Sequence, residues 1–430
     1  MIQKLMQYVR KLMQKGAFHI VVGNFLTKFV SFFGSVFLVR SLSKTEYGIL
    51  SYYENFNTYF LLLAGLGLAK GIQRHMILQQ SMPEKYGCYR YAMQNGTFWN
   101  VIVVILCASF CLLYPHPEAF QGYPAVIMVL TLSIPFMFLK ETVLSALRAL
   151  FDYKNYALLA FITSVLVIAL RIIGAYLGGL NGTTTGKLMS EMLGAMICLL
   201  LIKWRFFYKV KPVKLPAEAK RDLKVYSVQM MLTDGLWAIF MLNDLFLLGQ
   251  LGGNEATVAD YKIAYVIPAN LSILVSAVGV FVGPYFTQRE SQNDYEWVRK
   301  KLALVLKVTS AVMGVAVLFC FILAKPLILL MYGKEYLTAL PTMRVLLVAS
   351  FFNNGVRSCV ANVLSAMGDQ KSNLYVAGIG IVLQIALDVY CIPRFGAIGL
   401  AFSSMSVYIM MSVLLLRVFY KRYGKKDTKA

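Results

Sequence analysis

Long apolar runs separated by short polar segments dominate the chain. Most of the runs reach about 20 residues or more, the length that crosses a hydrocarbon layer of about 30 Å as an α-helix. They predict about twelve membrane-spanning helices, at residues 17–41, 46–72, 91–114, 123–150, 156–177, 186–204, 226–248, 258–285, 301–323, 337–367, 373–392 and 397–420. The pattern is therefore that of an all-α integral membrane protein.

Composition agrees with this class. The 430 residues are 59% hydrophobic and only 14% charged, whereas a soluble domain carries about 25% charged residues. A soluble multi-domain enzyme is therefore excluded. The formal net charge of +22 would suggest nucleic acid in a soluble protein, but here the basic residues gather at the ends of apolar runs, beside lipid headgroups. Membrane lipids, and no nucleic acid, are the expected partners.

Basic residues also predict the orientation of the chain. The N-terminal segment, the even-numbered loops and the C-terminal tail carry most Lys and Arg, whereas the loops at 115–122 and 250–257 carry none. The exceptions on the other side are Lys44, Lys325, Lys334 and Arg394. Cytoplasmic loops are the ones enriched in Lys and Arg, so both termini are expected in the cytoplasm.

The chain divides near its middle into two similar halves. A basic stretch at 205–225 separates an N-terminal lobe, 1–204, from a C-terminal lobe, 226–430. The string VLSA recurs at 143–146 and 363–366, each time ahead of an Asp, a Lys, an Asn and a Tyr. Six helices per half place the two copies in the same orientation, related by a pseudo-two-fold axis along the membrane normal. Such a duplication is typical of transporters; a receptor or scaffold of twelve helices is the alternative.

Ionisable side chains within the apolar runs are candidates for function, because each is costly unless it faces a bundle interior or a wet cavity. Four cations are expected to bind substrate: Lys28, Arg171, Lys262 and Arg357. Arg presents a two-pronged donor that suits phosphate, so these residues predict a cationic cavity for an anionic headgroup. In the alternative interpretation a nearby acid neutralises each one, for instance Asp244 for Lys262.

Four carboxylates within the apolar runs are candidates for coupling transport to a proton or Na⁺ gradient: Glu54, Asp234, Asp244 and, close to the outer end of its helix, Asp388. Burial makes a carboxylate easier to protonate near neutral pH. The alternative is a structural hydrogen bond or ion pair between helices.

Motifs for catalysis are absent from the sequence. The string at 182–188 has the wrong glycine spacing for a phosphate-binding loop and is predicted to lie outside the cytoplasm. The three histidines are scattered, so no zinc site, other metal site or cofactor is predicted. The outer loops are too short for the catalytic domain of a glycan polymerase or ligase. The protein is therefore not expected to be an enzyme.

Several strings carry a resemblance to a known family. They are RSLSKTEYG, GLGLAK, SALRA, DLFLLG, PLILLMYG, LSAMGD and IPRFG, at 40–48, 65–70, 145–149, 244–249, 326–333, 364–369 and 392–396. In this order and spacing the chain resembles the oligosaccharide-lipid flippases of bacterial polysaccharide biosynthesis, in the multidrug/oligosaccharidyl-lipid/polysaccharide exporter superfamily.

The resemblance implies two six-helix lobes that work by alternating access in the bacterial inner membrane. The substrate it implies is an undecaprenyl-diphosphate-linked oligosaccharide, carried from the cytoplasmic to the outer leaflet. The same superfamily includes lipid II flippases and drug exporters, so a cation-coupled multidrug exporter remains the alternative. Cationic drugs fit less well with the four candidate cavity cations Lys28, Arg171, Lys262 and Arg357.

Overall fold

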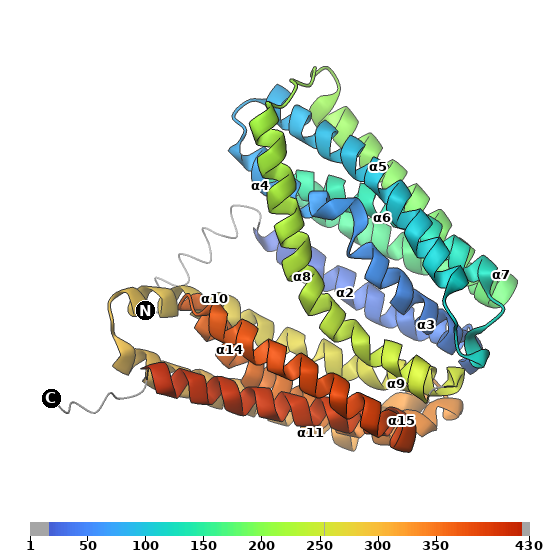
Figure 1. The fold of residues 1–430 in the computed structure, drawn as a ribbon, viewed down its shortest axis with the longest axis vertical. Helices are drawn as coiled ribbons and strands as arrows, with labels where there is room; N and C mark the ends of the chain where they lie inside the picture. Colours follow the sequence, from blue (N-terminus) through green and yellow to red (C-terminus); the bar gives the residue numbers. More distant parts are fainter. Residues whose placement is uncertain (1–16, 253, 424–430) are drawn as a thin grey trace. The chain divides into compact units, whose positions relative to one another are not determined.

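The computed structural model describes residues 17–252 and 254–423, and every regular element in these ranges is a helix. Seven helical stretches there are long and apolar enough to cross a membrane, which confirms an all-α, multi-pass membrane protein. The chain forms two compact units, Met1–Leu242 and Asn243–Ala430, called unit 1 and unit 2 below. Most of their helices are labelled in Figure 1.

The described part of unit 1, from Ala17 on, contains six α-helices and the first part of a seventh. These are α2 (Ala17–Arg40), α3 (Lys44–Leu61), α4 (Leu68–Leu78), α5 (Met82–Leu113), α6 (Pro124–Ala149), α7 (Tyr153–Ile202) and α8 (Ala217–Leu251). Capping boxes start α3 and α5: Ser43 pairs with Glu46, and Ser81 with Glu84. The division between the units falls inside α8, beyond the basic stretch 205–225, whose last residues form the first turns of α8.

Unit 2 continues with α9 (Glu255–Asn270), α10 (Ser272–Ser291), α11 (Tyr295–Ile322), α12 (Ala324–Met331), α13 (Leu340–Ser350), α14 (Ser358–Ala366) and α15 (Gln370–Tyr423). A wider π-helical segment, Phe351–Arg357, joins α13 to α14. An apolar core that includes Leu302, Val360, Leu364 and Phe419 holds α11, α14 and α15 together.

The long helices α7 and α15 each fold back on themselves. In α7 the chain turns at Gly178 and Gly179, and a Cβ on Gly174 would lie only 2.0 Å from the carbonyl oxygen of Gly182. The two halves therefore pack face to face as antiparallel helices. The loop expected at 178–185 is wrong: the turn needs only two glycines, and the rest of that segment is helical. In α15 the same reversal occurs at Gly396.

These two hairpins are copies of one another. They begin at positions 153 and 370, 217 apart, and turn at Gly179 (φ 56°, ψ −131°) and Gly396 (φ 56°, ψ −137°), again 217 apart. An ion pair closes each hairpin at its open end, Asp152–Arg205 at 2.9 Å and Asp369–Arg422 at 2.6 Å. The helix starts, the turn glycines and the ion pairs are all separated by the same number of residues, which supports the internal duplication.

The two turn glycines give a paired prediction. Ala is strained at a positive φ of this kind, at a cost of about 1–3 kcal/mol. A Cβ at Gly179 would in addition lie 2.4 Å from Oε1 of Glu46, whereas at Gly396 the nearest atom is 4.0 Å away. We expect Gly179→Ala to lower the melting temperature of the purified protein more than Gly396→Ala does. Equal or reversed effects would contradict this geometry.

Three of the expected helices are broken. The helix expected at 46–72 is interrupted at Ala64–Gly67, where Gly65, Leu66 and Gly67 have positive φ. The helix expected at 258–285 divides into α9 and α10 just after Pro268, and the one expected at 337–367 contains the π-helical segment. Pro and positive-φ residues do not sustain regular α-helical hydrogen bonding, which explains the first two breaks.

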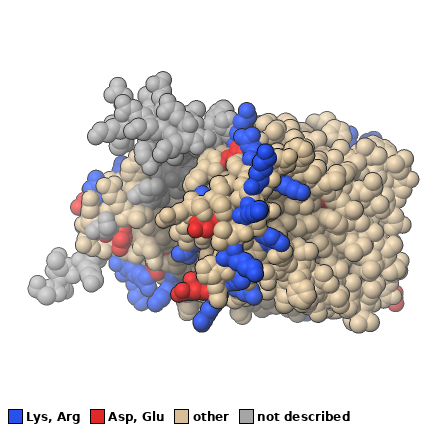
Figure 2. All heavy atoms as spheres, turned by 90° about the horizontal axis from the view of Figure 1, so that it is seen from above, with Lys and Arg blue, Asp and Glu red and all other residues tan. Residues whose placement is uncertain are grey.

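The surface matches a membrane setting. Large apolar side chains are widely exposed, for example Leu113 (83%), Leu177 (83%) and Phe98 (72%). Figure 2 shows a wide surface without charged residues beside a region where Lys and Arg gather. Exposed apolar helical surfaces of this kind are typical of proteins that contact lipid, and basic residues are typically enriched near headgroups.

Candidate functional site

Unit 1 contains a cavity of about 470 Å³ between α2, α6 and α7. Much of its wall is polar or charged although the helices are apolar overall. The polar lining residues are Thr27, Ser31, Ser35, Lys140, Glu141, Tyr156, Thr163, Ser164, Arg171 and Glu191. A cavity with hydroxyls and both signs of charge suits a polar ligand more than a purely apolar one.

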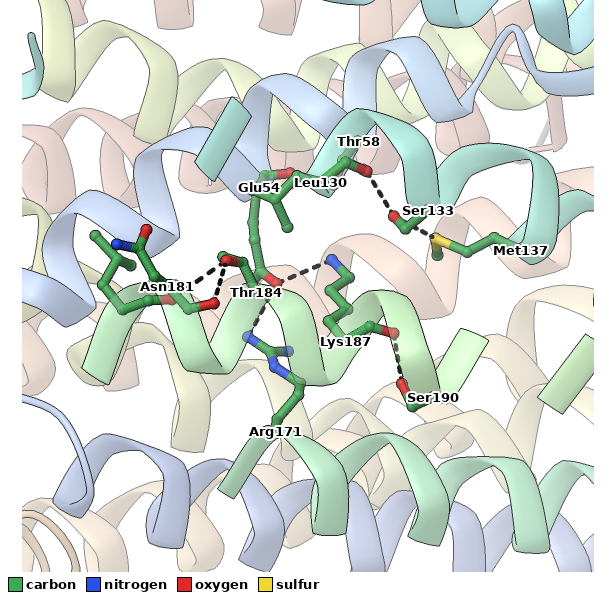
Figure 3. A network of polar contacts seen from close by, with 11 residues as sticks. Glu54, Thr58, Leu130, Ser133, Met137, Arg171, Asn181, Thr184, Lys187 and Ser190 are labelled. Carbon is green, nitrogen blue, oxygen red and sulfur yellow. Dashed lines mark hydrogen bonds and ion pairs between the residues drawn. The ribbon is translucent and has the colours of Figure 1, made fainter. Parts of the chain in front are cut away.

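A charge cluster extends the cavity wall at Arg171. Glu54 on α3 accepts from Arg171 on the first half of α7 and from Lys187 on the second half, both at 2.9 Å (Figure 3). Less than a quarter of each side chain is exposed: 24% for Glu54, 15% for Arg171 and 12% for Lys187. One carboxylate thus neutralises two cations only in part, and the cluster keeps a formal charge of +1.

A second buried pair lies in the same cavity. Lys140 on α6 donates to Glu191 on α7 at 2.5 Å. Two polar atoms of the wall are buried without a hydrogen-bond partner, Oγ1 of Thr27 and Nε of Arg171. Unpaired buried polar atoms are costly and rare, so these two are the polar atoms of the wall whose hydrogen bonding is incomplete.

Unit 2 gathers two carboxylates around one amide. Nε2 of Gln384 donates to Asp388 at 2.9 and 3.0 Å and to Asp244 at 3.4 Å. Tyr261 and Ser404 also donate to Asp244, at 3.0 and 3.3 Å. Asp388 is fully buried, and within the described residues no Lys or Arg forms an ion pair with either carboxylate. We call this set the acidic centre.

Arg357 lies in the π-helical segment of unit 2 and is buried, with 8% exposed. Its Nε donates to Oδ1 of Asn353 at 2.6 Å, and Nη2 donates to Ser358 at 3.3 Å. π-Helical turns often occur at functional positions of helices. The local backbone therefore supports Arg357 as a candidate functional residue.

The other predicted residues are more dispersed. Lys28 is exposed on α2 and is absent from the described wall of the cavity, and Lys262 is half-buried on α9. The side chain of Asp234 lies outside the described residues. The structure thus brings together Arg171 with Glu54 in unit 1 and Asp244 with Asp388 in unit 2.

Sequence reasoning missed Lys187 and Glu191. Both lie within the helix expected at 186–204, but neither was singled out as a candidate. The expected start of that helix at Gly186 is wrong, because the turn at Gly178–Gly179 is short and the helix already includes the buried Thr183 and Thr184. Gly174, Gly182 and Gly186 lie where the two halves of α7 touch, and small residues are typical of closely packed helices. These glycines are the signal that could have revealed the tight hairpin.

The internal repeat relates the two sites with opposite charge. At the spacing of 217, Arg171 corresponds to Asp388 and Lys187 corresponds to Ser404. Unit 1 therefore has cations where unit 2 has an acid and a hydroxyl.

Solved structures with the same fold are membrane transporters. The fold matches "Lipid II flippase MurJ, inward closed conformation" with a TM-score of 0.72 and 16% identity, over 94% of this chain and 89% of that one. It matches an outward-facing multidrug resistance transporter of the MATE family with a TM-score of 0.62 and 14% identity, over 97% of both chains. The likeness shows the fold, and with the seven apolar stretches it defines the class as a multi-pass membrane protein.

Sequence comparison defines the family. The profile of the family described as "Polysaccharide biosynthesis protein" matches residues 37–341, and that of "Lipid II flippase MurJ" matches residues 262–430. The chain belongs to the polysaccharide biosynthesis protein family. It is 20% identical over 249 residues to a Shigella flexneri protein named as an O-antigen transporter, a match that spans 57% of either chain.

Proposed function

We propose that this protein is a flippase that moves a lipid-linked oligosaccharide from the cytoplasmic to the outer leaflet of the bacterial inner membrane. The observation that carries the proposal is the family match over residues 37–341. The likeness to an O-antigen transporter and the fold shared with a lipid II flippase support it. The substrate we propose is an undecaprenyl-diphosphate-linked repeat unit.

Alternating access of two six-helix lobes is the mechanism that fits this substrate. We propose about twelve membrane crossings, as the sequence pattern predicts, with α7 and α15 crossing twice each because they fold back. The positive-inside rule then places both termini in the cytoplasm. The polar headgroup needs a hydrated path, whereas the lipid tail stays in the bilayer. No covalent step is needed, so the protein acts as a transporter and not as an enzyme.

The cavity of unit 1 is the proposed contact for the headgroup. Arg171 offers an unpaired Nε–H in a wall that also contains Lys140 and several hydroxyls. Guanidinium donors suit diphosphate oxygens, and hydroxyls suit sugars. Lys28, Lys262 and Arg357 are proposed to contact the anionic headgroup at other stages of the cycle.

The acidic centre is the proposed coupling site. Asp244 and Asp388 share the amide of Gln384, and neither forms an ion pair with a described Lys or Arg. Such a pair of carboxylates favours binding of H⁺ or Na⁺, because either cation offsets their mutual repulsion. Hard cations prefer oxygen ligands such as carboxylate, amide and hydroxyl, which Asp244, Asp388, Gln384 and Ser404 supply. Glu54 already pairs with two cations, and so supports structure more than coupling.

Arg357 gives a direct test of a residue in the transport path. We expect cells with Arg357→Ala to accumulate lipid-linked repeat units on the cytoplasmic face, as cells lacking the protein do, while the amount of protein in the membrane is unchanged. Arg357→Lys keeps the charge and is expected to retain partial export. Normal export by the Arg357→Ala strain would remove this residue from the mechanism.

A cation-coupled multidrug exporter is the second candidate, supported by the fold shared with MATE transporters. The two candidates differ in the phenotype of a deletion strain. Loss of a drug exporter lowers the inhibitory concentrations of cationic drugs, whereas loss of the proposed flippase changes surface polysaccharide. A drug-susceptibility panel run beside a polysaccharide gel separates them.

A further inference from the structure

A second pocket lies in unit 1 where α5 and α8 begin, away from the cavity between α2, α6 and α7. Its volume is about 350 Å³, and Arg90, Tyr91, Lys214 and Lys220 are among its lining residues. The described lining includes no Asp or Glu. We infer that this basic pocket binds the phosphate-bearing headgroup of a lipid. The inference does not depend on the proposed flippase function.

The walls of the basic pocket are held in place by the linker between α7 and α8. The backbone N–H of Val213 donates to the carbonyl oxygen of Pro83 at 3.1 Å. Gly87 lies against the same linker, since a Cβ there would be 1.9 Å from the carbonyl oxygen of Val213. The ring of Phe207 stacks on Tyr86 with centroids 4.3 Å apart. The pocket is thus formed by packed backbone and is more than a gathering of surface charges.

The cations of the basic pocket form no ion pair in the described part of the chain, although the exposed Glu218 and Asp222 are close to Lys220 in sequence. No ion pair there involves Arg90, Lys214 or Lys220. Glu84, the closest acid in sequence to Gly87, accepts from the backbone N–H groups of Gln80 and Ser81. Gathering three like charges is unfavourable, and a bound anion offsets that repulsion.

Its position favours a lipid phosphate over a soluble anion. Arg90 lies eight residues into α5, a membrane-spanning candidate that starts at Met82, or about 12 Å along the helix. Trp204 and Tyr208, in the first part of the linker, are 69% and 63% exposed and stack together. Exposed aromatic rings of this kind are typical of the membrane interface, and basic pockets at that level bind anionic headgroups.

Lipid binding by the full-length protein in detergent, counted by native mass spectrometry, tests the inference. The pocket variant combines Arg90→Gln, Lys214→Gln and Lys220→Gln. The control variant combines Lys154→Gln, Lys209→Gln and Lys371→Gln, three exposed residues outside the pocket that remove the same charge. The probes are phosphatidylglycerol, undecaprenyl diphosphate and, as a zwitterionic reference, phosphatidylcholine.

We expect the pocket variant to bind at least one of the two anionic lipids about tenfold more weakly than the wild type, and the control variant to match the wild type. Preference for phosphatidylglycerol identifies the ligand as a membrane phospholipid, and preference for undecaprenyl diphosphate identifies it as the carrier lipid. Equal binding by wild type and pocket variant would overturn the inference, as would equal weakening in the control variant.

Gly87→Ala separates a shaped pocket from diffuse charge. This change keeps every cation but pushes the linker at Val213 away from α5. We expect it to weaken binding of the anionic lipid while the protein still elutes as a single species. Unchanged binding in a folded Gly87→Ala protein would contradict a built pocket. If this variant does not fold, the comparison of the two triple variants decides alone.

Discussion

Glu54→Gln is expected to destabilise unit 1 by up to about 3 kcal/mol, because it leaves the partly buried Arg171 and Lys187 without the carboxylate that both contact. Breaking a buried ion pair from one side costs more than the pair itself contributes. The measurement is the melting temperature of the purified protein, together with the amount of protein that reaches the membrane.

Lys187→Met is the matched control for Glu54→Gln. It removes one of the two cations and leaves Glu54 paired with Arg171 as a neutral couple, so we expect a loss of about 1 kcal/mol or less. If Glu54 holds the cluster together, Glu54→Gln must destabilise the protein more than Lys187→Met does. If Lys187→Met destabilised the protein as much as Glu54→Gln, the cluster would not be held together by its single carboxylate.

Asp388→Asn is expected to uncouple transport from the membrane gradient without unfolding unit 2. The amide has the size of the carboxyl and can still hydrogen-bond Gln384, but it cannot hold a proton or Na⁺ by charge. One elementary charge moving across 100 mV is worth about 2.3 kcal/mol, which corresponds to roughly a 50-fold gradient of substrate between leaflets. That gradient is what the variant loses.

The measurement for Asp388→Asn is the rate of substrate movement in vesicles with and without an imposed H⁺ or Na⁺ gradient. Asp244→Asn is expected to give the same result, because both carboxylates share Gln384. Ser404→Ala removes only one hydrogen bond to Asp244 and is expected to slow transport less. A rate in Asp388→Asn that still rises with the gradient would show that coupling lies elsewhere.

The helices could be predicted from sequence because apolar length is a sufficient signal for a membrane span. The breaks at Gly65–Gly67 and after Pro268 carry local residues that could have been recognised. The π-helical segment before Ser358 has no such signal. The turn of α7 was misjudged because two glycines reverse a helix where a loop of eight residues was expected.

The sites could be predicted only as individual charged residues. Depth in the membrane pointed to Arg171, Glu54, Asp244 and Asp388, but not to their pairing, because partners come from helices far apart in the chain. Lys187 lies at the start of the expected helix 186–204, so its depth did not single it out. Arg357 was found by depth alone, and its partners Asn353 and Ser358 are on its own helix.

The most direct test of the central claim is transbilayer movement by the purified protein. Vesicles containing the protein and a fluorescent undecaprenyl-diphosphate-linked oligosaccharide are treated with a dithionite-type reagent that cannot cross the membrane, and the protected fraction is measured. A flippase makes the label accessible beyond the outer-leaflet half seen in protein-free vesicles. An accessible fraction equal to that of protein-free vesicles, with folded protein present, substrate supplied and either cation gradient imposed, would contradict the account.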